Sequence, residues 1–181
     1  GEKDEPALQT LFETLGYKVL LLTNLSGAQI KKALQIVTGH ENMSFAKLRN
    51  PKDKKNLEKL NAEDCLVSGD HDSFVLCLMT HGEESVVLGT DNEEFKINEI
   101  YNIAGKCENL TNKPKMVFIQ ACRGDDIPQA DGDSVTKKPR DFFFSFATFH
   151  GHAAFRGKDS TWYVKALCEI FENGHKTKDL L

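Results

Sequence analysis

Apolar residues recur along the chain with two different spacings, and these spacings predict its secondary structure. A repeat of three or four residues predicts amphipathic helices over residues 6–15, 26–37, 97–104 and 161–171. Largely apolar runs predict buried strands over residues 17–22, 74–79, 86–91, 115–120 and 142–149, the third of these ending in a turn. Helices that alternate with buried strands are typical of an α/β domain with a mostly parallel sheet.

Small and polar residues mark where the predicted helices begin and end. Ser26 stands before the second helix and is a preferred N-cap residue. Glycine readily adopts the left-handed conformation that follows many helices, and it follows three of these at Gly16, Gly39 and Gly105. The helix boundaries are therefore indicated by signals that do not depend on the apolar repeat.

Two stretches, residues 40–72 and 124–140, interrupt the pattern because they contain few residues that a core would bury. In the first, Asn50-Pro51 precedes the charged run Lys52-Asp53-Lys54-Lys55. A solvated surface insertion is the favoured interpretation there, and a basic docking patch is the alternative. The second stretch is rich in aspartate, glycine and proline, which predicts an exposed, mobile loop.

Polar side chains follow two of the predicted strands at the point where each strand ends. His81 comes just after the strand over residues 74–79, and Cys122 just after the strand over residues 115–120. Neighbouring parallel strands end at the same edge of a sheet, so imidazole and thiol are expected side by side. A thiol beside a group that accepts and returns its proton is suited to nucleophilic catalysis. The alternative for Cys122 alone is a buried structural thiol.

Composition limits the class of protein. At 181 residues, with 40% hydrophobic and 28% charged residues, the chain fits one folded domain. A net charge of −4 gives no electrostatic case for nucleic acid, and no apolar run approaches the roughly 20 residues that span a membrane. Five cysteines without a CxxC pair favour reduced thiols in a cytoplasmic protein. Neither a phosphate-binding loop nor a third ligand beside His150 and His152 is found, so no cofactor or metal is expected.

The residues around Cys122 carry a resemblance to a known family. Gln120-Ala121-Cys122-Arg123-Gly124, with His81 about 40 residues upstream, resembles the caspase signature. The resemblance implies a caspase-like, three-layer α/β/α fold and an aspartate-specific cysteine endopeptidase. Cys122 would be the nucleophile and His81 the general acid and base. The backbone N–H groups of Gly82 and Cys122 would form the oxyanion hole.

The same resemblance implies a pocket for the substrate aspartate. Gln120 falls on a position that lines this pocket in the family, and Arg156 falls on the position of a pocket arginine. A planar, bidentate guanidinium suits the recognition of a carboxylate. The family's second pocket arginine falls immediately upstream of Gly1, so it lies outside this sequence. A surface arginine is the alternative for Arg156.

The outer part of the expected substrate site departs from the family pattern. Ala153 and Ala154 stand where family members usually carry an aromatic residue and a serine that contacts the substrate backbone. Phe155 and Trp162 keep the aromatic character that is expected of the outer subsites. The two alanines therefore bear on substrate affinity and on the preference of the second subsite.

The resemblance also implies how the chain is organised. Residues 1–181 form one incomplete caspase-like domain, with a large-subunit-like part over 1–124, a linker over 125–140 and a small-subunit-like part over 141–181. The family's first strand and its last strand and helix have no counterpart, and residue 1 is not Met, so we expect native ends and a prodomain outside this sequence. Self-processing is expected after Asp133, then Asp131, and a merely solvated acidic loop is the alternative.

The function implied by the resemblance is cleavage of proteins after aspartate by a cytoplasmic zymogen in programmed cell death. Its partners would be protein substrates, other caspase chains in a dimer, and caspase inhibitors or regulators, without nucleic acid or membrane. An alternative is a catalytically weak homologue that regulates active caspases by binding them, which Ala153 and Ala154 favour. Intact Cys122 and His81 oppose it. An unrelated flavodoxin-like binding domain would require the pairing of these two residues to be accidental.

Overall fold

The structure, a computed structural model, describes residues 3–41, 48, 66–83, 85–123, 141–148, 152, 154 and 160–174. The charged stretch around Lys52, the linker with Asp131 and Asp133, and the residues Phe155 and Arg156 lie outside the described residues. Within the described part, none of the helices is long and apolar enough to cross a membrane.

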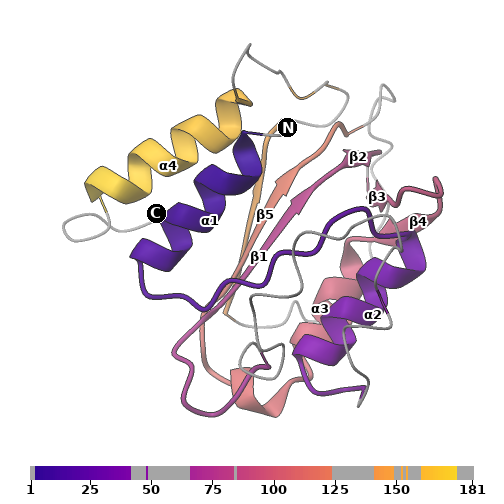
Figure 1. Ribbon diagram of the computed structural model, residues 1–181. Coiled ribbons are helices and arrows are strands. Elements are labelled where there is room, and N and C mark those ends of the chain that lie inside the picture. Colours follow the sequence, from indigo (N-terminus) through magenta and orange to yellow (C-terminus); the bar gives the residue numbers. More distant parts are fainter. Residues whose placement is uncertain are drawn as a thin grey trace, which may run out of the picture.

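A parallel sheet of three strands lies at the centre (Figure 1). Its order is β1 (Phe74–Met79), β5 (Lys115–Gln120) and β6 (Phe142–Phe146), with β5 in the middle and parallel to both neighbours. Every residue of β5 is buried, as the apolar run over residues 116–119 predicts for a strand covered on both faces.

Helices cover both faces of this sheet, which gives three layers (Figure 1). Side chains of β5 alternate between the two faces, so that Phe118 packs in one hydrophobic cluster and Val117 in the other. The first cluster is completed by α1 (Asp4–Thr14) and α4 (Trp162–Gly174), and the second by α2 (Gly27–Val37) and α3 (Asn98–Ala104). The expected α/β class, a parallel sheet flanked by helices, is confirmed.

The helix ends follow from local chemistry. The Ser26 hydroxyl accepts a hydrogen bond from the backbone N–H of Gln29, and the Gln29 side chain accepts one from the Ser26 N–H, which is a complete capping box. Gly16 and Gly39 follow their helices with φ angles of 89° and 76°, conformations that are strained for any side-chain-bearing residue. Asp4, at the start of α1, accepts a hydrogen bond of 2.9 Å from the Thr161 N–H and so joins the starts of α1 and α4.

A second, small antiparallel sheet follows β1, and the apolar pattern did not predict it in full. It consists of β2 (His81–Gly82), β3 (Val86–Leu88) and β4 (Glu94–Lys96), of which only β3 was expected. A short 3-10 helix, Glu108–Leu110, precedes β5. The small sheet places His81, which the sequence put just after the strand over residues 74–79, on a short strand of its own.

One predicted strand is wrong and another is shorter than expected. Residues 17–22 form no strand, although five of these six residues are apolar. A cavity of about 800 Å³ is lined both by residues 17–25 and by residues 72–80, and strands must approach to roughly 4.8 Å before a hydrogen-bonded ladder forms. The strand predicted over residues 142–149 ends at Phe146.

Candidate active site

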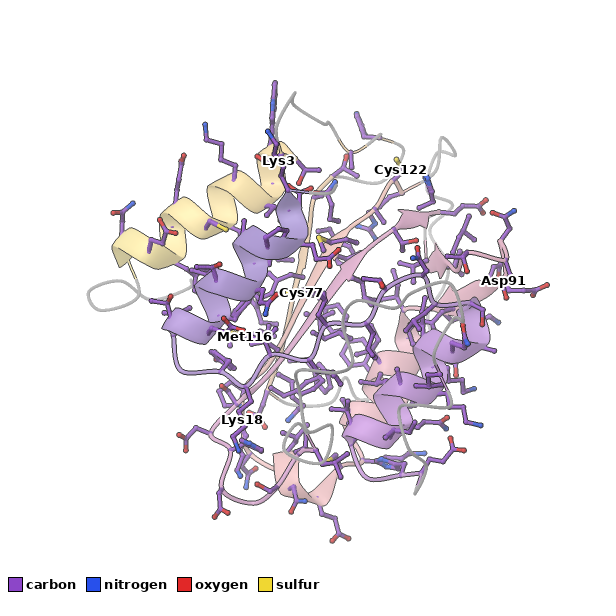
Figure 2. The ribbon with its side chains drawn as sticks, in the orientation of Figure 1. Lys3, Lys18, Cys77, Asp91, Met116 and Cys122 are labelled. Carbon is purple, nitrogen blue, oxygen red and sulfur yellow. The ribbon has the colours of Figure 1, made fainter. Side chains whose placement is uncertain are left out.

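The strands that carry the predicted imidazole and thiol are direct neighbours. β1 and β5 run parallel, and the last residues of the two strands, Met79 and Gln120, are register partners. The Thr80 N–H donates a hydrogen bond of 3.1 Å to the Gln120 carbonyl just beyond this pair. The chain therefore leaves both strands at one edge of the sheet, with His81 one residue after Thr80 and Cys122 two residues after Gln120. Figure 2 shows Cys122 at this edge.

His81 is held by the small sheet. It pairs with Leu88 across the antiparallel β2–β3 ladder, and its side chain is exposed. The Thr80 hydroxyl donates a hydrogen bond of 2.6 Å to the carbonyl of the same Leu88. Because little packing surrounds an exposed imidazole, its direction depends on the backbone to which it is attached.

The antiparallel pair β2 and β3 forms a hairpin that carries His81, here called the histidine hairpin. Gly82 brings the backbone of this hairpin against the backbone of residues 121–123, here called the cysteine segment. A Cβ atom added to Gly82 would lie 2.8 Å from the Val86 carbonyl oxygen, 3.0 Å from the Ala121 Cβ and 3.0 Å from the Cys122 carbonyl oxygen. Side chains do not tolerate contacts this short, so a glycine is required here. The residue after His81 and the carbonyl of Cys122 are thus in direct contact.

The residues on both sides of Cys122 are held by packing or by hydrogen bonds. Ala121 before it is buried, and Cys122 itself is partly exposed at the rim. Beyond it, the Arg123 N–H donates a hydrogen bond of 3.3 Å to the His152 carbonyl. The guanidinium carbon of Arg123 lies 4.0 Å from the centre of the Phe146 ring, a cation–π arrangement.

The other described cysteines are in different surroundings. Burial, with a smaller contribution from Cys168, raises the pKa of the Cys77 thiol to about 12, and burial also raises the pKa of Cys168. Cys107 is buried. Since the thiolate is the attacking form of cysteine, Cys77 and Cys168 have the character of packing thiols. Among the described cysteines, Cys122 is the one beside the histidine hairpin.

The side chain of Gln120 is buried, and its hydrogen-bond acceptor is not used by any described group. Its side chain is only 7% exposed, and within the described part of the chain its Oε1 atom has no hydrogen-bond partner. A buried acceptor without a donor costs roughly 1–3 kcal/mol, so this position favours the approach of a donor group. Gln120 lies on the same strand as the thiol, two residues before it.

The structure assembles only part of the predicted site. Gln120, Cys122, His81 and Gly82 meet at one edge of the sheet. Ala154 is partly buried, and Trp162, at the start of α4, is 68% exposed. The predicted residues Arg156, Phe155, Asp131 and Asp133 lie outside the described residues, so their places are untested.

The sequence reasoning missed two features of this edge. The contact between Arg123 and Phe146 joins the residue after the thiol to the next strand, although Arg123 was visible in the pentapeptide. Thr80, which bonds to both Gln120 and Leu88, stands between the predicted strand and the histidine and was given no role in the sequence analysis. The signal for Thr80 was a β-branched hydroxyl residue directly between a buried strand and a histidine.

No group of three or more His, Cys, Asp or Glu side chains in the described part is arranged to hold a metal ion. His152 lies in the described part, and His150, its suggested companion, lies outside it. The edge of the sheet thus brings the backbone segments that carry His81 and Cys122 next to each other.

Comparison with known proteins gives a consistent result. Residues 44–181 match the family described as Caspase domain. The chain is 30% identical to Caspase-2 of Gallus gallus, over 94% of this chain and 41% of that protein. It is 28% identical to Caspase-8 of Rattus norvegicus, over 98% and 36%, and 30% identical to Caspase-1 of Drosophila melanogaster, over 88% and 53%. The chain spans about half or less of the length of these relatives. On this family match and these relatives, the chain belongs to the caspase family.

Proposed function

We propose that this chain carries the catalytic core of a cysteine endopeptidase that cleaves proteins after aspartate. The observation that carries the proposal is the contact between the histidine hairpin and the cysteine segment. The Cβ position of Gly82 lies 3.0 Å from the Cys122 carbonyl oxygen, which leaves His81 and Cys122 on adjoining backbone segments at the rim of the sheet. A cysteine that served only in packing would not require a histidine-bearing segment beside it.

The reaction follows from the groups at this edge. His81 takes the proton of the Cys122 thiol, and the sulfur attacks the carbonyl carbon of the scissile peptide bond. The backbone N–H groups of Gly82 and Cys122 donate to the oxyanion that forms. His81 then gives the proton to the leaving amine as the carbon–nitrogen bond breaks. Water, deprotonated by His81, hydrolyses the thioester and releases the acid product and the free thiol.

Specificity for aspartate is assigned to Gln120 together with Arg156. The buried side chain of Gln120 has an acceptor that no described group satisfies, so an arginine N–H is a suitable partner for it. A guanidinium in this place would also form paired hydrogen bonds with the substrate carboxylate. Ala154, Phe155 and Trp162 are proposed for the outer subsites.

The organisation and biology of the whole protein are proposed from the relatives, which carry the name caspase. We assign residues 1–124 to a large-subunit part, 125–140 to a linker cut after Asp133 or Asp131, and 141–181 to a small-subunit part. The active form would be a dimer of cleaved chains in the cytoplasm, acting on proteins in programmed cell death and controlled by caspase inhibitors.

A second candidate is a catalytically weak homologue that binds active caspases and regulates them. The observation that favours it is the pair Ala153 and Ala154, since alanine at the second position lacks the hydroxyl that contacts the substrate backbone in the family. Such a protein would bind caspase chains without turnover of its own.

Hydrolysis of fluorogenic tetrapeptides that end in aspartate tests the proposal. A matched set ends in asparagine, which has the same shape without the charge, and its turnover should be lower by orders of magnitude. Cys122→Ala should abolish hydrolysis. Cys168→Ala, which removes a thiol from the packing layer, should retain it. No turnover by the protein with its native ends restored and its linker cut would overturn the protease and favour the regulatory binder.

A further inference from the structure

Thr80 is the one residue between β1 of the central sheet and β2 of the small sheet. It follows β1, whose last residue is Met79, and precedes β2, whose first residue is His81. Both of its hydrogen-bonding donors are engaged, and they act in different sheets. The backbone N–H donates to the Gln120 carbonyl at 3.1 Å, and the hydroxyl donates to the Leu88 carbonyl at 2.6 Å.

The two acceptors belong to the two halves of the candidate site. Gln120 is the last residue of the strand that delivers the thiol, two residues before Cys122. Leu88 is the register partner of His81. Thr80 therefore holds the strand of the nucleophile with one donor and the hairpin of the base with the other.

The imidazole has few other constraints in the described part of the chain. His81 is exposed, and β2, on which it lies, is only two residues long. A ladder this short is weak without further support. The bond from Thr80 to Leu88 adds a side-chain connection at the place where the hairpin leaves the central sheet.

We propose that Thr80 is a positioning residue, whose hydroxyl sets the direction of His81 relative to Cys122. This inference rests on the proposed function, because it assigns a role in the reaction of the same site. Threonine suits the position for two reasons. Its branched Cβ restricts χ1, and its hydroxyl supplies a donor that a valine of the same shape lacks.

Thr80→Val keeps the shape and removes the donor, and Thr80→Ser keeps the donor and removes a methyl group. With aspartate tetrapeptides, we expect Thr80→Val to lower kcat about tenfold or more and to change KM less than about twofold, because small misplacement of a catalytic group affects the chemical step. Thr80→Ser should stay within about threefold of the parent chain. Thr90→Val is the matched control, because the Thr90 hydroxyl makes only a long, exposed hydrogen bond of 3.4 Å to Asn24, and it should change neither constant.

Alkylation of Cys122 by iodoacetamide provides a readout that does not depend on peptide hydrolysis. Thr80→Val should slow this alkylation, because a displaced His81 assists the thiol less. In a His81→Ala background, the same Thr80→Val change should have no further effect. Such a double-mutant cycle separates action through the histidine from general disruption. Thermal unfolding checks that each variant is folded, and Thr80→Ala replaces Thr80→Val if the latter is not.

Several outcomes would overturn the role of Thr80. These are a normal kcat in Thr80→Val, an increase in KM alone, or slowing of alkylation that is equal with and without His81. An alkylation rate that His81→Ala leaves unchanged would also overturn it, since Thr80 would then have no base to position. If the parent chain hydrolyses no aspartate peptide, the proposed protease fails, and the alkylation cycle still decides the role of Thr80.

Discussion

The guanidinium carbon of Arg123 lies 4.0 Å from the centre of the Phe146 ring, so the residue after the candidate nucleophile is fastened to the last residue of β6. The Arg123 N–H also bonds to the His152 carbonyl at 3.3 Å. These contacts join three separate segments around Cys122. The thiol is thereby held by contacts beyond its own strand.

Removing the ring should loosen this segment. We expect Phe146→Leu to lower kcat/KM by about two- to fivefold, because a partly exposed cation–π contact contributes roughly 0.5–1 kcal/mol. Phe143→Leu is the control, since its ring lies on the other side of the strand and packs against Phe118. It should lower the melting temperature and leave the kcat/KM of the folded protein unchanged. Equal kcat/KM values in the two variants would contradict a role for the Arg123 contact.

The thiols of Cys122, Cys77 and Cys168 should differ in their rates of alkylation. Burial raises the pKa of Cys77 to about 12, and each pH unit below a pKa leaves roughly tenfold less thiolate. At about pH 8, iodoacetamide should therefore modify Cys122 well before Cys77 or Cys168, and Cys77 should react only in denaturant. Peptide mapping by mass spectrometry measures the order. Modification of Cys77 as early as Cys122 would contradict the packing described for β1.

The hydrogen bonds of Asp91, which is labelled in Figure 2, lead us to expect that the protein loses stability in acid. Its Oδ1 atom accepts hydrogen bonds of 3.1 Å from the N–H groups of Gly27 and Glu93, and the bond from Gly27 is the largest cause of its lowered pKa. A lowered pKa contributes stability that is present above the unfolded pKa, about 4, and is lost as the pH falls through the folded value.

The variant Asp91→Asn retains the acceptor without the titrating charge. We expect the melting temperature of the parent chain to fall more steeply than that of Asp91→Asn between about pH 4 and pH 2. Asp70→Asn, which removes an exposed carboxylate elsewhere, controls for net charge. Parallel curves for the parent chain and Asp91→Asn would show that these two hydrogen bonds do not favour the ionised form.

The sequence was most informative where long runs of one kind of residue occur. Residues 74–79 contain six consecutive apolar residues and residues 115–120 contain four, and both segments became strands whose ends meet. The polar residues that directly follow them identified the edge at which His81 and Cys122 lie. The prediction of these two strands succeeded because burial on both faces leaves a parallel strand little choice of residue.

The failures occurred where pairing with a distant segment decides the structure. Residues 17–22 have the apolar content of a strand, but strand formation requires a partner within hydrogen-bonding reach, and sequence does not state whether one is present. β2 has two residues and β4 has three, too few for a period to be recognised. The bond between Thr80 and Leu88 depends on that hairpin, so it could not be predicted either.

Gly82→Ala is the most direct test of the contact between the two halves of the site. The added Cβ would lie 2.8 Å from the Val86 carbonyl oxygen and 3.0 Å from the Cys122 carbonyl oxygen, and both are backbone atoms that cannot move aside cheaply. The hairpin must therefore shift away from Cys122. A shift of about 1 Å at a catalytic group is expected to lower kcat by about a hundredfold, whereas the core beneath β1 and β5 stays intact.

Gly69→Ala is the matched control for this substitution, because its Cβ would meet only the Asn109 side chain at 3.9 Å, an ordinary contact. We expect the control to keep full hydrolysis of aspartate tetrapeptides and the parent melting temperature. For Gly82→Ala we expect a cooperative unfolding transition together with lost turnover and slower alkylation of Cys122. Normal turnover by a folded Gly82→Ala variant would mean that the hairpin tolerates displacement, and that the approach of Gly82 to Cys122 is not needed for the reaction.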